Sequence, residues 1–195
     1  SLCRIMLAPA NGHKHDSENP VTMSLSAIKT TSFSPDYGLH NPHLQSVLSN
    51  IGLRRRQVLH AFAHLRDSTK ALIVPCADDV QLLAHYTPAV SGGPLVLLIH
   101  GWEGSAESIY LLSAAATFHA AGYSVLRLNL RDHGDSHHLN KDLFHSCRLQ
   151  EVLDAVAWAQ QRFRPSELLL GGFSLGGNFA VRVAAAADDE GLSID

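Results

Sequence analysis

The chain has 195 residues, enough for one domain with a sizeable core, and 46% of them are hydrophobic while 17% are charged. Its formal net charge of −3 gives no electrostatic reason to expect binding to nucleic acid or to an anionic membrane surface. No stretch approaches the roughly 18 apolar residues of a membrane-spanning helix, so we expect none. The three cysteines are widely spaced and form neither a metal pattern nor a disulfide framework, which suits a reducing compartment and a cytoplasmic location.

The N-terminal part of the chain carries little structural signal. Residues 1–22 mix polar residues with Pro and Gly and show no hydrophobic periodicity, which predicts disorder. The chain does not begin with Met, and Met23 opens a more structured stretch, so we interpret residues 1–22 as a leader or an over-extended reading frame. We expect residues 1–40 to be disordered or extended and residues 41–195 to form the folded domain.

A helix is predicted to begin at Asn41 and Pro42, because Asn is a favoured N-cap and Pro fits the first helical position. Four apolar residues share one face of this helix: Leu44, Val47, Leu48 and Ile51. The arginines at 54–56 are placed at its end, where cations suit the helix dipole. Three arginines in a mildly acidic chain do not favour a nucleic-acid site.

Two short strands are predicted next, at residues 57–66 and 71–75. The polar pair Asp78 and Asp79 predicts a tight turn. Residues 71–87 therefore look like a β-hairpin.

Beyond the hairpin, the pattern alternates between strands and helices. The continuous apolar run at 95–99 is typical of a strand buried on both faces of a parallel sheet. Further strands are predicted at 123–130 and 168–173, and helices at 106–121, at 147–163 and after Ser174. This alternation predicts an α/β fold, with a mostly parallel sheet, helices on both faces and right-handed crossovers.

Residues 172–176 (Gly-Phe-Ser-Leu-Gly) have the Gly-x-Ser-x-Gly pattern of a nucleophile elbow, which holds a serine on a sharp strand-to-helix turn. A strand-like run precedes the motif and a helical pattern follows it, as the motif requires. Gly172 and Gly176 occupy positions where strand and helix come so close that a Cβ would clash. One alternative is a Gly-rich connection with a surface serine. A phosphate-binding loop fits badly, because Gly177 and Asn178 stand where Lys and Ser or Thr are required.

Three loops follow the carboxyl ends of predicted strands, where α/β sheets bind ligands: residues 100–105, 131–138 and 172–177. When a serine sits on an elbow, the oxyanion donors are the backbone N–H of the next residue and one N–H from an earlier strand-to-helix loop. These donors map to Leu175 and Trp102.

The loop at 131–138 also contains histidines and aspartates that are possible metal ligands. His137 and His138 are adjacent, however, and do not easily share a face. We therefore expect a polar loop there and no metal site.

Four motifs in order resemble the α/β-hydrolase superfamily and, within it, the YheT-like esterase branch. They lie at residues 41–46, 100–105, 131–136 and 172–178, so the resemblance covers about 40–187. It implies a serine carboxylesterase with a Ser-Asp-His triad, a small-molecule acyl ester substrate and no cofactor. It also implies that His100 and Gly101 organise the loop before the oxyanion donor. Asp132 departs from the family pattern, since related hydrolases often carry Gly there.

The acid and the base of such a triad follow the serine in the chain, and here neither has an obvious candidate. No histidine follows His145, and the later acids lie on or just beyond the helix that follows Ser174. We interpret the chain as a hydrolase truncated after the nucleophile strand and its helix, and we expect it to be inactive. A non-catalytic binding chain or pseudoenzyme is the alternative, and His100 or His133 as a rewired base is another.

Overall fold

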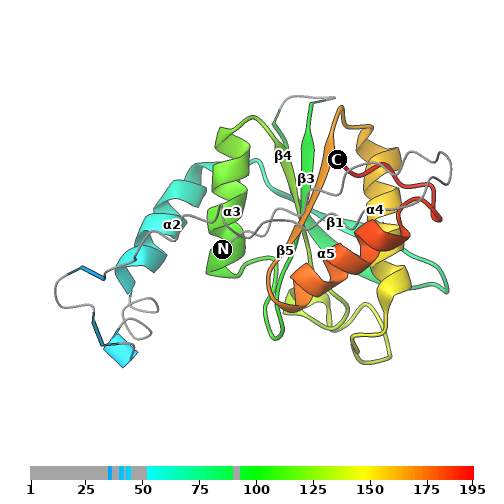
Figure 1. Ribbon diagram of the computed structural model, residues 1–195, viewed down its shortest axis with the longest axis horizontal. Helices are drawn as coiled ribbons and strands as arrows, with labels where there is room; N and C mark the ends of the chain where they lie inside the picture. The colour runs from blue at the N-terminus through cyan, green and yellow to red at the C-terminus, as the bar shows by residue number, and fades with distance from the viewer. Residues whose placement is uncertain (1–34, 37–39, 42, 45–51, 90–92) are drawn as a thin grey trace, which may run out of the picture. The chain divides into compact units, whose positions relative to one another are not determined.

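The computed structural model of the protein (Figure 1) describes residues 35–36, 40–41, 43–44, 52–89 and 93–195. The predictions for residues 1–34 and for the apolar face at 47–51 lie outside the described residues. The predicted N-cap is confirmed, because the side-chain Oδ1 of Asn41 accepts hydrogen bonds from the backbone N–H of His43 (2.9 Å) and Leu44 (3.4 Å).

Five strands form one mixed sheet with the order β1-β2-β4-β3-β5. They are β1 (Lys70–Pro75), β2 (Gln81–Thr87), β3 (Leu95–Ile99), β4 (Ser124–Leu128) and β5 (Leu168–Gly172). β2 runs antiparallel to β1 and to β4, whereas β3 runs parallel to both β4 and β5. The parallel half of the sheet therefore contains the three strands whose loops carry the candidate site residues.

β1 and β2 form the hairpin that the polar pair Asp78 and Asp79 predicted. Asp78 and Asp79 both adopt left-handed backbone conformations, with φ of 55° and 59°. The backbone N–H of Cys76 donates to the carbonyl of Val80 at 2.8 Å and closes the turn. Aspartate tolerates this conformation better than most residues, which explains the choice of side chain.

The segment predicted as a strand at 57–66 is a helix, α2 (Gly52–Arg66), so that prediction was wrong. Val58, Phe62 and Leu65 are the buried residues of this segment, and they recur every three to four positions, as on one face of a helix. The arginines at 54–56 lie inside α2, so their placement at the end of a preceding helix was also wrong.

The other helices agree with the predicted ranges: α3 (Ile109–Ala120), α4 (Leu149–Phe163) and α5 (Leu175–Ala186). A short 3-10 turn, η2 (Gly134–Ser136), lies in the loop after β4. Gly122, with φ of 91°, follows α3 and ends it, as glycine does after many helices. Within the described ranges, no helix is both long and apolar enough to cross a membrane.

The central strand β3 is buried along its whole length and feeds two cores. Its odd-numbered residues pack with α4 and α5, while Val96 and Leu98 pack with α2 and α3. Figure 1 shows the two helix pairs on opposite sides of the sheet. This arrangement confirms the α/β class and leaves the carboxyl ends of the parallel strands to the loops.

Candidate active site

The three candidate loops begin side by side at one edge of the sheet. Ile99 at the end of β3 pairs with Leu128 of β4 and with Gly172 of β5. Because all three strands are parallel, the loops that follow them leave the sheet at the same level. The sequence motifs at 100–105, 131–136 and 172–178 therefore meet in space.

Ser174 lies on a tight turn between β5 and α5. Its φ of 52° and ψ of −115° fall outside the regions that a residue with a Cβ adopts without strain. The turn is closed by the N–H of Gly176, which donates to the carbonyl of Phe173 at 2.9 Å, and by the N–H of Asn178, which donates to the carbonyl of Ser174 at 3.0 Å. The serine is exposed on the surface.

The two glycines beside the serine leave no room for a side chain. A Cβ on Gly172 would lie 2.2 Å from the carbonyl carbon and oxygen of Gly176. A Cβ on Gly176 would lie 2.4 Å from the carbonyl oxygens of Ile99 and His100. These atoms belong to the backbone and cannot move aside cheaply, so the sharp turn requires glycine at both positions.

The loop after β3 lies against the serine turn. A Cβ on Gly101 would lie 3.2 Å from the carbonyl oxygen of Phe173 and 3.3 Å from the Cβ of Ser174. Trp102 follows directly, with 63% of its surface exposed. Among the described residues, the backbone N–H groups of Trp102 and Leu175 donate no hydrogen bond to the protein. Two unused donors therefore belong to residues next to Gly101 and Ser174.

His100 is fully buried and uses both ring nitrogens. Its Nε2 accepts the N–H of Leu130 at 3.1 Å, so the ring proton sits on Nδ1, which donates to the carbonyl of Gly101 at 2.7 Å. Burial is the main cause that lowers the pKa of His100 to about 4; the hydrogen bond to Gly101 opposes the shift, and the nearby His133 adds to it. A neutral imidazole with both nitrogens occupied cannot take a proton from Ser174.

His133 does not bond to the serine either. Its Nδ1 is 2.8 Å from the carbonyl oxygen of Arg131. Its ring is tilted against that of His100 (4.8 Å between centroids) and lies edge-on to Phe144 (4.9 Å). Among the described residues, no side chain hydrogen-bonds the Oγ of Ser174. The described residues thus supply a strained serine and free N–H groups without a bonded acid or base.

Asp132 adopts a backbone conformation that is less favourable for a residue with a side chain than for glycine. Its φ is 59°, in the left-handed region that glycine adopts freely. Its carboxylate lies 2.6 Å from Nδ1 of His137 and partly compensates by pairing locally. The described residues contain no group of three or more His, Cys, Asp or Glu side chains that could hold a metal ion.

The loop after β3 is also held by residues that the sequence analysis did not single out. The N–H of Gly101 donates to the hydroxyl of Tyr110 at 3.0 Å, and the N–H of Ala106 donates to Oδ1 of Asn129 at 2.7 Å. Arg127 and Asn129 are buried polar residues that alternate with the buried leucines at 126, 128 and 130. That contrast was the available signal, since buried polar groups need partners.

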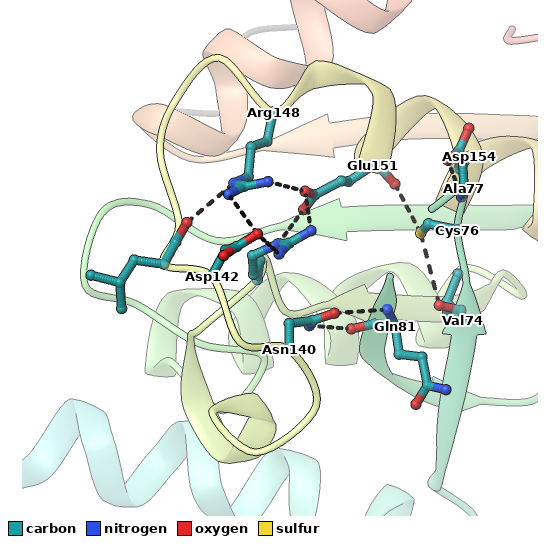
Figure 2. A network of polar contacts seen from close by, with 11 residues as sticks. Val74, Cys76, Ala77, Gln81, Asn140, Asp142, Arg148, Glu151 and Asp154 are labelled. Carbon is teal, nitrogen blue, oxygen red and sulfur yellow. Dashed lines mark hydrogen bonds and ion pairs between the residues drawn. The ribbon is translucent and has the colours of Figure 1, made fainter. Parts of the chain in front are cut away.

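A cavity of about 660 Å³ lies elsewhere, between the β1–β2 turn, the loop after β4 and the first turns of α4. In its polar network (Figure 2), Glu151 accepts from the guanidinium group of Arg148 at 3.2 Å, and Asn140 pairs with the backbone of Gln81. The guanidinium group of Arg131 also donates to Glu151, at 2.7 Å. Ser174 does not line this cavity. Because its charged groups mainly satisfy one another, we interpret the network as a structural tie between loop, hairpin and helix.

Residues 94–191 match the family model described as alpha/beta hydrolase fold, so the chain belongs to that family. Two curated bacterial proteins are similar to it. "Putative esterase YheT" of Escherichia coli is 28% identical over 165 residues, which cover 84% of this chain and 46% of that protein. "Putative esterase/lipase" of Haemophilus influenzae is 28% identical over 101 residues, which cover 52% of this chain and 32% of that protein. The chain spans less than half the length of either relative.

Solved esterase structures share the fold. Est1E from Butyrivibrio proteoclasticus, with ferulic acid bound, is 25% identical with a TM-score of 0.55, and the match covers 61% of this chain and 49% of that one. The esterase Pf2001 from Pyrococcus furiosus is 22% identical with a TM-score of 0.54, and the match covers 62% of this chain and 47% of that one. The likeness to Pf2001 extends to the fold alone.

Proposed function

We propose that the protein is a carboxylic ester hydrolase in which Ser174 is the nucleophile and forms an acyl-enzyme with a small-molecule ester. The observation that carries the proposal is the strained backbone of Ser174, against which Gly101 lies, together with the N–H groups of Trp102 and Leu175, which lack partners among the described residues. Strain of this kind persists only where surrounding structure enforces it, and it concentrates at functional sites. The esterase names of the curated relatives support the same reaction class.

In the proposed reaction, the hydroxyl of Ser174 attacks the ester carbonyl and the carbonyl oxygen becomes an oxyanion. The N–H groups of Trp102 and Leu175 donate to that oxyanion. Leu175 is the first residue of α5, so the positive end of the helix dipole adds to the stabilisation. His100 and Gly101 organise the loop: the histidine ties it to β4, and the glycine allows its close approach to the serine.

We infer that the 195-residue chain alone has negligible esterase activity. No histidine follows His145, His100 is occupied by backbone groups, and no described side chain hydrogen-bonds Ser174. Without a base, the elbow and the oxyanion donors leave only residual catalysis, orders of magnitude below that of an intact triad. A non-catalytic binding chain is the second candidate, favoured by the same missing base.

The test is hydrolysis of p-nitrophenyl acetate, together with labelling by a fluorophosphonate probe, in the native protein in which this sequence occurs (the full-length protein) and in the 195-residue chain by itself. In the full-length protein, Ser174→Ala is expected to abolish labelling and lower kcat by about 10⁴-fold or more. The exposed Ser166→Ala is the matched control and keeps wild-type rates. Activity that survives Ser174→Ala, or a full-length protein that neither turns over nor labels, would overturn the proposal.

A further inference from the structure

The loop that presents the Trp102 N–H is tied at both ends to the neighbouring strand β4. At its start, His100 bridges the carbonyl of Gly101 and the N–H of Leu130, the residue two positions after β4. At its end, the loop enters the turn that leads into α3 through Ala106, which is fully buried. The contacts of Ala106 set the geometry of this second end.

Both polar groups of the Ala106 backbone are held by side chains from β4 or its end. Its N–H donates to Oδ1 of Asn129 at 2.7 Å, and its carbonyl accepts from Nη1 of Arg127. Arg127 and Asn129 are two positions apart, so their side chains leave the same face of the extended chain. The same Nη1 also bonds Oε1 of Glu107 at 2.8 Å, which extends the grip to the next residue. We call these two side chains the Ala106 clamp.

Burying the charged side chain of Arg127 in the clamp costs folding free energy. Arg127 is completely buried, and its Nε and Nη2 have no hydrogen-bond partner among the described residues. Its charge is balanced by Glu107 and by the ring of Phe62, 4.7 Å from the guanidinium carbon. Replacing buried charged groups with apolar residues of similar volume is often neutral or stabilising, so stability alone does not explain an arginine here.

Space around the clamp is also fitted closely. Gly134, with φ of 59°, lies against it, and a Cβ there would be 3.0 Å from Oδ1 of Asn129 and 3.1 Å from the Cβ of Ser105. A side chain at residue 134 would therefore press on the amide oxygen of Asn129 that binds the N–H of Ala106. A displacement of Asn129 would move the segment from Ser105 to Ala106, a few residues after Trp102.

We propose that Asn129 and Arg127 are positioning residues for the oxyanion hole, which hold the loop so that the Trp102 N–H faces the reacting carbonyl beside Ser174. The inference rests on the proposed function. An oxyanion donor stabilises the negative charge that develops in the transition state. A misplaced donor therefore lowers kcat and the affinity for transition-state analogues, while substrate binding stays nearly unchanged. Removing one such donor costs roughly 10²–10³ in kcat, and a shifted donor is expected to cost about 10–100-fold.

The decisive comparison is Asn129→Leu, which removes the acceptor at similar volume, against Asn129→Asp, which keeps an acceptor oxygen beside Arg127. In the full-length protein, we expect Asn129→Leu to lower kcat by about 10–100-fold with KM within about 2-fold. Affinity for a boronic acid that mimics the tetrahedral intermediate should fall in the same proportion. Asn129→Asp should retain most of both.

Three results would overturn the inference: an unchanged kcat in folded Asn129→Leu, a loss confined to KM, or equal losses in the Leu and Asp variants, which would indicate packing alone. Amide hydrogen exchange supplies a readout that does not need activity. Asn129→Leu, or Arg127→Met if the first variant folds poorly, should speed exchange in residues 100–106 but not in α4, and unchanged exchange would refute the clamp. A wild-type protein without Ser174-dependent hydrolysis would refute the proposed function and leave this exchange test intact.

Discussion

Replacing Gly172 by alanine tests the steric account of the serine turn directly. The added Cβ would lie 2.2 Å from the carbonyl carbon and oxygen of Gly176 and 2.5 Å from the nitrogen of Gly177. These distances are about 0.9–1.2 Å short of the 3.4 Å at which ordinary van der Waals contact begins. Because all three atoms belong to the backbone of the first turn of α5, the whole turn must shift away from β5.

Overpacking of a close-packed site typically costs about 1–3 kcal/mol and sometimes more, and a clash with backbone belongs at the upper end. We expect about 3 kcal/mol or more for Gly172→Ala. At about 2–4 °C per kcal/mol for a domain of this size, the midpoint of thermal unfolding should fall by about 6–12 °C.

Gly177→Ala is the matched control, since it adds the same methyl group in the same turn. Its Cβ would meet only the carbonyl oxygen of Gly172 at 3.3 Å and the carbonyl carbon at 3.7 Å. Alanine is also favoured over glycine inside a helix by about 1 kcal/mol, which offsets that tight contact. Thermal unfolding of both variants, followed by circular dichroism in the full-length protein, decides the matter. Equal midpoints for the two variants would show that the turn tolerates a Cβ at residue 172 and that our reason for its glycine is wrong.

Three further predictions follow from other contacts. Because burial lowers the pKa of His100 from 6.5 to about 4, the unfolded chain binds more protons between these values, so stability should fall as the pH drops from about 6.5 towards 4. His100→Gln should show a weaker fall in denaturant titrations, and identical pH profiles would contradict this. Asp132→Gly should change the unfolding free energy by less than about 1 kcal/mol. Glycine adopts the positive φ without strain, and this gain offsets the lost contact with the exposed His137 and the greater entropy of glycine in the unfolded chain. A loss above about 2 kcal/mol in urea unfolding would refute this. No described strand pairs with the outer edge of β5, where Asp195 bonds the N–H and the carbonyl of the first residue, Leu168. The 195-residue chain should therefore aggregate or bind a hydrophobic dye, and a monomer with a sharp, cooperative thermal transition would contradict this.

The sequence was most informative where local rules dominate. The apolar run at 95–99 has to be buried on both faces, and it forms the central strand. The glycines around Ser174 predict a turn that other residues cannot make, because a Cβ at Gly172 or Gly176 would lie within 2.4 Å of backbone atoms. Asp78 and Asp79 identify the hairpin turn because few other side chains tolerate two successive left-handed residues.

Prediction failed where tertiary contacts decide. In residues 57–66 the apolar side chains are separated by histidines and alanines, so their helical spacing is easily mistaken for strand alternation, and packing on α3 and the sheet settles it. Arg127 and Asn129 stand out only as polar residues among the leucines at 126, 128 and 130, and nothing in the nearby sequence indicates that Ala106 is their partner. Contacts between loops of different strands depend on the register of the whole sheet.

The burial of β3 on both faces has a consequence for how that register is chosen. Its alternate residues enter two hydrophobic cores, so a slip by one residue would move one apolar side chain into the place of another at little hydrophobic cost. The slip would, however, separate His100 from the N–H of Leu130 and leave both as buried polar groups without partners. The hydrogen bond between His100 and Leu130 thus favours the observed register of β3 against β4. Substitutions there should produce misaligned chains during folding as well as altered chemistry afterwards.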